Sequence, residues 1–292
     1  MGKGKKPQTG REALQWAASF FQGRGAMDKG QALLEARLLL AKAWNKEMIY
    51  LITNLGEKLP GEVWRRFAAF AARRADYEPL QYILGEQEFM SLSFKVTPAV
   101  LIPRSDTEVL VEEAIRLLKG RQAPKILDLG TGSGAIAVSL AYYLPEAQVW
   151  AVDISEDALA VARENASRHN VDARICFYHG DLFAPLPPQM KYDLIVSNPP
   201  YVGEAEYEEL PADVKKEPVL ALLGGEDGLE FYSRIAAQAP LFIEKGGALL
   251  LEIGWRQAEQ VKGLLAENGF SPVSILPDLG GRDRVVFAGR SR

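Results

Sequence analysis

The segment Lys125–Tyr143 constrains the fold of this chain more than any other part of the sequence. An apolar run at Lys125–Leu129 leads into Gly130-Thr-Gly-Ser-Gly134, and a helical stretch follows at Ala135–Tyr143. Glycines permit a tight backbone turn and the close approach of a ligand, and the N-terminus of the following helix attracts an electron-rich group. The segment therefore predicts a strand, a glycine loop and a helix that together bind a ligand.

Strands and helices alternate from residue 105 to the end of the chain. This alternation is typical of right-handed crossovers and of a mainly parallel sheet with helices on both faces. The last two predicted strands are joined by a short link without a helix, so we expect them to pair antiparallel. The prediction is an α/β fold with a seven-stranded sheet. The expected strands are Lys125–Leu129, Gln148–Val152, Ala173–Tyr178, Tyr192–Ser197, Ala248–Ile253, Val273–Leu276 and Arg284–Ala288, and the expected helices lie around residues 105–118, 134–143, 155–168, 228–244 and 256–268.

The N-terminal part of the chain has helical rather than strand periodicity. Apolar residues recur at helical spacing in Arg11–Gln22 and Gln31–Trp44, and a third helix is expected around Lys46–Thr53. A fourth helix starts at Pro60, because proline is favourable in a first helical turn. These segments predict a small all-α bundle.

Residues Glu88–Val96 alternate weakly around Ser91, which predicts a short β-hairpin between the two regions. We interpret this hairpin as a hinge. The expected organisation is a helical bundle at residues 1–84, a hairpin linker at residues 85–104 and an α/β domain at residues 105–292.

The composition is that of an ordinary globular protein, with 48% hydrophobic and 25% charged residues. Cys176 is the single cysteine, and we expect it to be a small apolar residue buried in a strand. A cysteine without a disulfide partner fits a protein of the reducing cytoplasm. The basic stretch Met1–Pro7 lacks the apolar segment of a signal peptide. No run approaches the ~20 apolar residues of a membrane span, so we expect no membrane contact.

Charge is distributed unevenly along the chain. Residues 1–90 have a net charge of +4 and residues 91–292 a net charge of −8, which gives −4 for the whole chain. Proteins that wrap nucleic acid gain affinity by neutralising phosphates with basic residues. The acidic second part of the chain therefore argues against nucleic acid as a partner. The basic residues of the first part are interpreted as a solvated tail and solvated helix faces.

The residue Asp153 ends the strand after the glycine loop, 19 positions beyond Gly134. A carboxylate at this place accepts hydrogen bonds from both hydroxyl groups of an adenosine ribose. However, Gly130, Gly132 and Ala135 also satisfy the G-x-G-x-x-A pattern of NAD-binding proteins. The glycine loop thus predicts an adenosine cofactor and leaves open whether it is S-adenosylmethionine or NAD.

Two further acidic residues follow strands of the same predicted sheet. Asp128 is a candidate for holding the positively charged amino-acid end of S-adenosylmethionine, or else a structural residue next to a helix N-terminus. Asp181, in His179-Gly-Asp-Leu-Phe183, is a candidate contact for the adenine amino group, or else an ordinary loop residue.

The loop Asn198-Pro-Pro-Tyr201 directly follows the predicted strand Tyr192–Ser197. Two consecutive prolines exclude a helix and keep the loop extended and rigid. The side-chain oxygen of Asn198 and the carbonyl oxygen of Pro199 can accept the two hydrogens of a planar –NH2 group, and Tyr201 can lie over its plane.

An acceptor pair of this kind returns electron density to the nitrogen and aligns it with an electrophilic methyl group. The loop therefore predicts methyl transfer from S-adenosylmethionine to a planar amide or amine nitrogen. Asn198, Pro199 and Tyr201 are the candidate catalytic residues, and Pro200 completes the substrate-binding loop. Because no strong base is required, His169 and His179 are interpreted as surface or loop residues.

Several longer motifs accompany these two loops. They are Glu88-Phe89, Val96-Thr-Pro-Ala-Val-Leu-Ile-Pro-Arg104, Asp106-Thr-Glu108, Ile126-Leu-Asp-Leu-Gly-Thr-Gly-Ser-Gly-Ala-Ile-Ala137, Glu217-Pro218, Leu222-Leu-Gly-Gly-Glu-Asp-Gly228 and Gly280-Gly-Arg-Asp-Arg284. With them the sequence resembles the peptide-chain release-factor glutamine methyltransferases, the HemK/PrmC family, over nearly its whole length. The Pro-Arg-x-Asp-Thr-Glu and Gly-Gly-x-Asp-Gly segments make this resemblance more specific than Asn-Pro-Pro-Tyr, which amino-methylating DNA enzymes share.

The resemblance implies a Rossmann-like class I methyltransferase domain that uses S-adenosylmethionine, releases S-adenosylhomocysteine and needs no metal. Its implied substrate is the glutamine of the Gly-Gly-Gln loop in class-1 release factors, held by Asn198–Tyr201 and recognised by the helical first domain. Leu182 stands where relatives often carry a tryptophan, so packing on the adenine falls to Leu182 or Phe183. The implied cofactor-binding residues are Asp128, Gly130, Thr131, Gly132, Ser133, Gly134, Asp153, Ile154, Asp181, Leu182 and Asn198.

Three other functions remain open from the sequence. A DNA adenine or cytosine amino-methyltransferase needs a target-recognition region, but the segment Gly203–Leu223 next to the site is acidic and repels phosphates. The other two are an NAD-dependent oxidoreductase and a non-catalytic binding module that retains a cofactor pocket. Arg104 and Glu108 begin a predicted helix, where they line the cofactor pocket or clamp the hinge.

Overall fold

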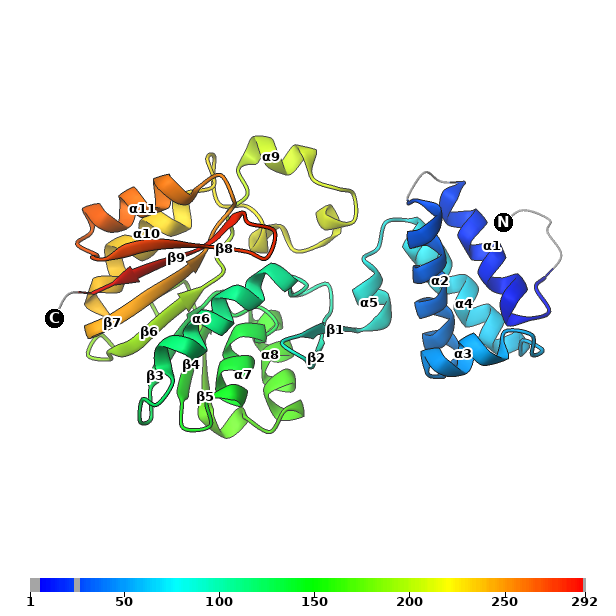
Figure 1. Cartoon of the computed structure of the whole chain (residues 1–292), viewed down its shortest axis with the longest axis horizontal. Helices are drawn as coiled ribbons and strands as arrows, with labels where there is room; N and C mark the ends of the chain where they lie inside the picture. Colours follow the sequence, from blue (N-terminus) through cyan, green and yellow to red (C-terminus); the bar gives the residue numbers. More distant parts are fainter. Residues whose placement is uncertain (1–5, 24–26, 291–292) are drawn as a thin grey trace. The chain divides into compact units, whose positions relative to one another are not determined.

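The computed structural model describes residues 6–23 and 27–290 of the 292-residue chain. The chain divides into two compact units (Figure 1). The first unit comprises Met1–Gly85 together with Ala212–Lys216, and the second comprises Glu86–Pro211 together with Glu217–Arg292. Residues 1–5 of the basic N-terminal stretch lie outside the described part of the chain.

The first unit is a helical bundle. Its helices are α1 (Gly10–Gln22), α2 (Lys29–Trp44), α3 (Met48–Asn54), α4 (Gly61–Ala75) and α5 (Leu80–Leu84). Side-chain caps start the first two helices: Thr9 accepts a hydrogen bond from an amide of α1, and Asp28 accepts two from amides of α2. Pro60 is the residue before α4 and not a member of its first turn, which corrects the expected start. The sequence does not predict α5, since five residues are too few to show a helical period.

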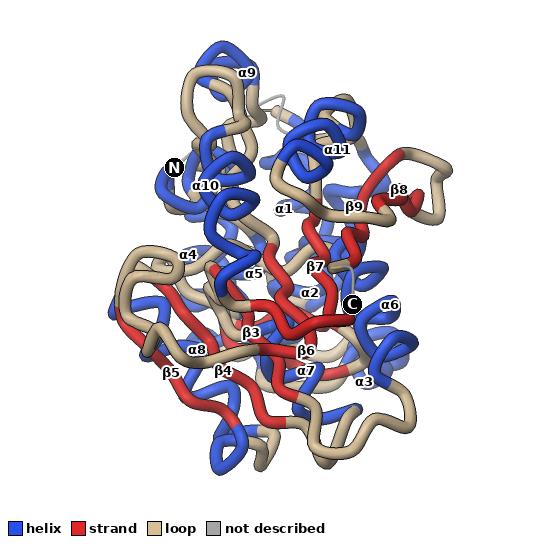
Figure 2. Tube along the Cα trace, turned by 90° about the vertical axis from the view of Figure 1, so that its left-hand side faces the viewer, coloured by secondary structure: helices blue, strands red, loops and turns tan. Residues whose placement is uncertain are grey.

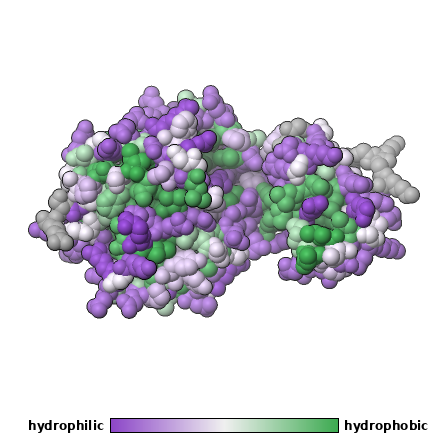
Figure 3. Space-filling model, in the orientation of Figure 1, coloured by the Kyte–Doolittle hydropathy of each residue, from purple (hydrophilic) through white to green (hydrophobic). Residues whose placement is uncertain are grey.

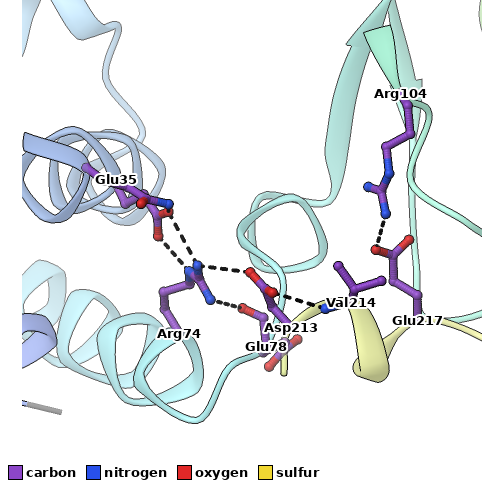
Figure 4. Close-up of polar contacts among 8 residues, drawn as sticks. Glu35, Arg74, Glu78, Arg104, Asp213, Val214 and Glu217 are labelled. Carbon is purple, nitrogen blue, oxygen red and sulfur yellow. Dashed lines mark hydrogen bonds and ion pairs between the residues drawn. The ribbon is translucent and has the colours of Figure 1, made fainter. Parts of the chain in front are cut away.

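A buried ion pair joins two helices of this unit. Arg74 on α4 is 4% exposed and Glu35 on α2 is 6% exposed, and Arg74 Nε donates to Glu35 Oε2 over 2.6 Å. The same guanidinium group lies 3.4 Å from Asp213 Oδ2 (Figure 4). The cation therefore holds α2, α4 and the returning segment Ala212–Lys216 together within one unit.

Hydrophobic residues also reach the surface of the helical unit, as the space-filling view shows (Figure 3). Leu34 on α2 and Ile49 and Ile52 on α3 are more than half exposed. Contiguous apolar surface on a folded domain often marks a site of protein contact.

The second unit is built around a mixed sheet of seven strands within the described residues. Its strands are β3 (Lys125–Leu129), β4 (Gln148–Asp153), β5 (Ile175–His179), β6 (Tyr192–Ser197), β7 (Ile243–Glu252), β8 (Val273–Pro277) and β9 (Asp283–Gly289). The strand order is β5-β4-β3-β6-β7-β9-β8. The first five strands in this order are parallel, while β9 pairs antiparallel with both β7 and β8. The predicted seven-stranded α/β sheet with an antiparallel end is confirmed.

Helices cover both faces of this sheet (Figures 1 and 2). One face packs against α6 (Glu108–Leu118), α7 (Ala135–Tyr143) and α8 (Glu156–Arg168), and the other against α10 (Glu230–Gln238) and α11 (Ala258–Glu267). Side chains alternate between the two cores along each strand, so that Ile126 faces the first set of helices and Leu127 the second. Both faces are therefore apolar, as a buried parallel sheet requires.

The region around Pro240 differs from its prediction. A helix over residues 228–244 is expected, but α10 ends at Gln238 and a single 3-10 turn, Ala239–Leu241, follows. Proline lacks an amide hydrogen and disfavours helical geometry in the residue before it. The chain then enters β7 at Ile243, five residues earlier than expected.

The predicted hairpin forms as β1 (Glu86–Phe89) and β2 (Leu92–Lys95), but it belongs to the second unit and is not a separate linker. Its turn residues Met90 and Ser91 both have positive φ, as a two-residue hairpin turn needs. Phe89 and Phe94 are fully buried in the core on the α6 side of the sheet. This burial joins the hairpin to the sheet.

Cys176 corrects a further expectation, because it is exposed. It lies on β5, an edge strand of the sheet, and is a member of neither packed core. Within the described part of the chain, no helix combines the length and the apolar character that crossing a bilayer requires.

Candidate active site

The two predicted loops meet where the strand order of the sheet reverses. From β3 the chain runs outward through β4 and β5, and it then returns to place β6 on the other side of β3. Leu129 and Ser197 are register partners and are the last residues of these two strands. In open α/β sheets, ligands bind at the carboxyl ends of the strands at such a reversal. The fold therefore brings the glycine loop and the Asn198–Tyr201 loop side by side.

The glycines of this loop have left-handed backbone conformations, which would be strained for a residue with a side chain. Gly130, Gly132 and Gly134 have φ values of 71°, 55° and 79°. A Cβ atom at Gly134 would also lie 3.1 Å from the Cβ atom of Ala162 on α8. The amides of Gly130 and Thr131 donate to the Val152 carbonyl oxygen over 2.9 and 3.0 Å, which ties the loop to β4.

The loop borders a cavity of about 230 Å³ that lies wholly within the second unit. Eight predicted site residues line it: Gly130, Gly132, Asp153, Ile154, Asp181, Leu182, Pro199 and Pro200. The remaining predicted residues stand outside its lining: Asp128, Thr131, Ser133, Gly134, Asn198 and Tyr201. Ala99, Val100 and Leu101 before α6, and Pro218, Leu220 and Ala221 in the second half of the acidic segment, also line the cavity and are not predicted from the sequence.

Leu182 and Phe183 have different surroundings. Leu182 lines the cavity in a left-handed conformation with φ 47°. Phe183 is 2% exposed and stacks on Phe242 at a centroid distance of 4.8 Å, inside the core. Of the two residues considered for contact with an adenine ring, only Leu182 faces the cavity.

Asp128, at the end of β3, is completely buried, and one of its oxygen atoms is unpaired. Its Oδ2 atom accepts a 2.6 Å hydrogen bond from the Thr131 hydroxyl, whereas Oδ1 has no partner among the described residues. Burial raises the pKa of this carboxyl group to about 7, and the neighbouring Asp153 carboxylate adds to the rise, while the Thr131 bond lowers it. An unpaired buried carboxylate oxygen fits a cationic ligand group, which would satisfy it.

Asp153 and Asp181 place carboxyl groups at the cavity wall. Asp153 accepts amide hydrogen bonds from Gly132 over 2.8 Å and from Ser155 over 2.9 Å, which orient it. Burial raises the pKa of Asp153, and these backbone bonds oppose the rise. Asp181 forms an ion pair with Arg234 on α10, which also lines the cavity. This partner of Asp181 is not evident from the sequence.

Asn198 is held by a residue from a distant segment. Its Nδ2 atom donates to Thr107 Oγ1 over 3.3 Å, and Thr107 is 4% exposed in the 3-10 turn Ser105–Thr107 that precedes α6. On the other side of the loop, Ser197 Oγ donates to the Leu129 carbonyl oxygen over 2.7 Å. These two bonds fix the start of the loop on both sides.

Tyr201 lines a second hollow and not the cavity beside the glycine loop. The second hollow also includes Glu206, Trp255, Gln257 and Arg284. Burial raises the pKa of the Tyr201 hydroxyl group, and the nearby Glu252 carboxyl group raises it further. The hydroxyl group of Tyr201 is therefore neutral, and the residue lines a hollow other than the cavity beside the glycine loop.

The glycines of Leu222–Gly228 are required by the Asn198–Tyr201 loop. Val202 pairs with Leu223 as a parallel bridge, and a Cβ atom at Gly224 would lie 2.6 Å from the Pro200 carbonyl oxygen. A Cβ atom at Gly228 would lie 2.2 Å from the Tyr201 carbonyl oxygen. The sequence singles out this glycine segment without a role, and the structure shows that it supports the loop from behind.

Arg104 and Glu108 have structural partners within the second unit. Arg104 forms an ion pair with Glu217, which is 4% exposed and also accepts a 3.0 Å bond from the Ile102 amide (Figure 4). Glu108 accepts a 2.6 Å bond from the Met90 amide in the hairpin turn. Neither residue lines the cavity. Arg104 thus holds the end of the acidic segment, and Glu108 holds the hairpin.

Neither histidine lines the cavity, although His179 lies next to it. The His179 ring nitrogen Nε2 lies 2.9 Å from the Ile154 carbonyl oxygen, and that of His169 lies 2.9 Å from the Ser93 carbonyl oxygen. His179 is exposed at the end of β5, and His169 is half-buried at the end of α8.

The comparison with protein families assigns both halves of the chain. Residues 12–85 match the PrmC N-terminal domain, and residues 106–213 match the methyltransferase small domain. The catalytic domain of hMettl16, solved with an RNA hairpin, is 19% identical with a TM-score of 0.56, covering 76% of this chain and 81% of that one. This likeness concerns the fold. The sheet order, the glycine loop and the matched families define a methyltransferase of the Rossmann-like class.

Relatives over nearly the full length give the particular family. The chain is 46% identical to the release factor glutamine methyltransferase of Geobacter sulfurreducens, over 97% of this chain and 98% of the relative. It is 49% identical to that of Moorella thermoacetica, over 88% and 91%. The chain belongs to the release factor glutamine methyltransferase family.

Proposed function

We propose that this protein transfers the methyl group of S-adenosylmethionine to the side-chain amide nitrogen of the glutamine in the Gly-Gly-Gln motif of class-1 release factors. The main support is the 46% identity to a release factor glutamine methyltransferase over 97% of the chain, which includes both units. The Asn-Pro-Pro-Tyr loop beside a glycine loop at one end of the sheet suits this reaction.

The residues around the cavity fit S-adenosylmethionine. Asp128 is outside the cavity lining, directly before the glycine loop, and its unpaired Oδ1 atom suits the cationic amino group of the cofactor. The cavity-lining Asp153 suits the ribose hydroxyls. Leu182 offers an apolar surface to the adenine in place of an aromatic ring. When bound, the cofactor supplies a sulfonium methyl group that is already strongly electrophilic.

The protein's task at the reacting end is to make an amide nitrogen nucleophilic. The nitrogen lone pair of a carboxamide is delocalised into its carbonyl group. In the proposal, Asn198 Oδ1 and the Pro199 carbonyl oxygen accept the two amide hydrogens and return electron density to the nitrogen. Alignment in such a site contributes up to ~7–11 kcal/mol to lowering the barrier. No strong base is needed, because the proton leaves after positive charge develops on the nitrogen.

The acceptor geometry depends on a rigid loop. Pro199 and Pro200 restrict the backbone, and the Leu222–Gly228 segment supports it through contacts that allow no Cβ atom at Gly224 or Gly228. We assign Tyr201 to the substrate side of the loop, because it lines the second hollow.

The helical unit is proposed to recognise the release factor. Residues 12–85 match a domain named after this family, and the exposed Leu34, Ile49 and Ile52 provide apolar contact area. Release factors act on cytoplasmic ribosomes, so a cytoplasmic location is part of this proposal. The proposal includes no nucleic acid partner, because the acidic residues of Gly203–Leu223 repel phosphates.

The test is a methyl-transfer assay with tritiated S-adenosylmethionine. A purified class-1 release factor should take up label, and the same factor with its loop glutamine changed to alanine should take up none. Equal labelling of both factors would exclude the glutamine as the acceptor. Isothermal titration with S-adenosylhomocysteine and with NAD separately tests the cofactor, and tight binding of NAD alone would overturn that part.

A further inference from the structure

A buried carboxyl group beneath the reacting loop has no role in the function proposed above. Glu252 is the last residue of β7 and is 1% exposed, and its Oε2 atom has no partner among the described residues. A buried polar group without a partner is costly, so its retention needs an explanation. Glu252 does not line the cofactor cavity.

The strand register brings Glu252 close to Asn198. Ser197 on β6 pairs with Leu251 on β7. Asn198 is the first residue after β6, and Glu252 is the last residue of β7. Thr107 lies between the two side chains: its hydroxyl oxygen accepts from Asn198 Nδ2 over 3.3 Å, and its hydroxyl group is near enough to the Glu252 carboxyl group to lower the pKa of that group. Three residues from separate segments thus lie within reach of one hydrogen-bonded chain.

The direction of hydrogen bonding in this chain follows from the number of hydrogens. An ionised Glu252 can only accept, so it takes the single hydroxyl hydrogen of Thr107. The Thr107 oxygen can then only accept from Asn198, and a carboxamide offers a donor only at Nδ2. The Oδ1 atom of Asn198 is consequently turned away from Thr107 and left free. If the carboxamide rotated by 180°, two oxygen atoms would face each other without a hydrogen between them.

We propose that Thr107 and Glu252 are positioning residues that fix the Asn198 carboxamide with Oδ1, and not Nδ2, facing the substrate nitrogen. The inference rests on the proposed function, because it needs Asn198 to accept a hydrogen from the substrate amide. A rotated Asn198 would present –NH2 to the –NH2 of the substrate and could not accept.

The protonation of Glu252 controls this orientation. Burial raises its pKa to about 7; the Thr107 bond and the charge of Arg284 lower it, the Asp106 carboxylate raises it, and Arg104 lowers it. The neighbouring hydroxyl groups of Tyr201 and Tyr232 stay neutral, since burial raises the pKa of both.

Above neutral pH, Glu252 is ionised and the active orientation is enforced. Below it, a protonated Glu252 donates to Thr107, which frees the hydroxyl hydrogen for Asn198 Oδ1 and permits the rotated carboxamide. We therefore expect kcat at saturating cofactor to fall as the pH drops below about 7.

The test compares Thr107→Val with Thr107→Ser in the full chain. Valine keeps the shape and removes the hydroxyl group, so kcat should fall about tenfold, the equivalent of one hydrogen bond. KM for the release factor and the affinity for S-adenosylhomocysteine should stay within about twofold, as expected of a change that acts only at the transition state. Serine restores the hydroxyl group, and most of the activity should return with it.

The pH profile supplies a readout that a merely structural role would not move. Thr107→Val should lose the acid limb of kcat, and Glu252→Gln should lose it as well while keeping measurable activity. A Thr107→Val enzyme with the wild-type kcat and acid limb would overturn the inference, as would equal impairment of the valine and serine variants. Thermal unfolding of each variant shows whether a loss reflects misfolding.

Asn198→Ala separates this inference from the proposed function. Full activity of Asn198→Ala would contradict the role of Asn198 itself. An inactive Asn198→Ala together with a normal Thr107→Val would contradict only the positioning chain. If Asn198 and the positioning chain both act as proposed, the double variant should be no less active than Asn198→Ala alone, because the effects of coupled residues are not additive.

Discussion

The hydroxyl group of Ser197 donates a 2.7 Å hydrogen bond to the carbonyl oxygen of Leu129, at the point where β6 and β3 end. Both residues are fully buried, and each directly precedes one of the two loops of the site. The bond therefore sets the position of the Asn198 loop relative to the glycine loop, between which a methyl group has to pass.

Replacing Ser197 with alanine should loosen this connection. The change leaves the Leu129 carbonyl oxygen without its side-chain donor, which costs about 1–3 kcal/mol when the group is buried. We expect a lower midpoint of thermal unfolding and a lower kcat, with less effect on S-adenosylhomocysteine affinity. Calorimetry and titration measure the two separately. An unchanged kcat would show that the bond is structural only.

Replacing Asn198 with alanine removes one acceptor of the substrate amide. We expect turnover to fall ~10²-fold or more, by analogy with the loss of one oriented hydrogen-bonding group in other active sites. Binding of S-adenosylhomocysteine should change little, because Asn198 does not line the cofactor cavity. Single-turnover methylation and isothermal titration check the two parts, and a fully active variant would contradict the assigned role.

The strands that carry the two loops are predictable from the sequence to the residue. Lys125–Leu129 and Tyr192–Ser197 are apolar runs ended abruptly by glycine or by Asn-Pro-Pro, so local chemistry fixes their bounds. The edge strand β5 is less well predicted, and Cys176 on it is exposed and not buried. Burial depends on which strand lies at an edge, and no local pattern encodes strand order.

The partners of the loop residues lie beyond the reach of sequence reasoning. Thr107 is 91 positions from Asn198, and it meets Asn198 only because the turn before α6 packs over the end of β6. Glu252 has the same origin in the pairing of β6 with β7. In contrast, the glycines of Leu222–Gly228 are visible as a motif, but their reason, the close approach of Pro200 and Tyr201, appears only in three dimensions.

Replacing Arg74 with methionine should unfold the helical unit more easily. Its partner Glu35 is 6% exposed and would be left as a buried carboxylate without a cationic partner, although the Gln31 side chain would still donate to it. Breaking one side of a buried ion pair costs about 3–5 kcal/mol. The matched control is Arg73→Met, since Arg73 is 44% exposed and pairs with Glu78 at the surface, where such pairs contribute about 0–1 kcal/mol. Equal unfolding midpoints for the two variants would contradict this account.

Replacing Gly224 with alanine should displace the reacting loop. The new Cβ atom would lie 2.6 Å from the Pro200 carbonyl oxygen and 2.8 Å from the Tyr201 Cα atom, and both are backbone atoms that cannot turn aside. A displacement of about 1 Å in a positioned group costs up to ~10²-fold in rate. We expect a large loss of kcat, measured in the methyl-transfer assay.

The control for that change is Gly263→Ala. Gly263 lies inside α11, and a Cβ atom there meets nothing within 4 Å. Alanine should stabilise the helix by about 0.5–1 kcal/mol and leave activity unchanged. A Gly224→Ala enzyme as active as Gly263→Ala would show that the loop tolerates the displacement.

Cofactor binding should weaken in acid if Asp128 holds a cationic group. Burial raises the pKa of Asp128 to about 7. A carboxyl group whose pKa is raised in the folded protein stabilises the fold while it is neutral. This contribution to the free energy of unfolding is lost as the pH rises from the pKa of the unfolded chain through 7. A cationic ligand reverses the preference, because it needs the ionised form. At pH 6 only about a tenth of the groups are ionised, so S-adenosylhomocysteine should bind about tenfold more weakly than at pH 8.

The variant Asp128→Asn shows whether the pH dependence of binding comes from Asp128 or from the neighbouring Asp153. The variant should bind S-adenosylhomocysteine weakly at pH 8 and show a flat profile between pH 6 and pH 8, as measured by isothermal titration. Asp153 also has a raised pKa from burial and stands at the cavity wall, so it is the alternative origin of an acid limb. If Asp128→Asn kept the wild-type slope, the titrating group would be Asp153, and the cationic end of the ligand would have to be held elsewhere.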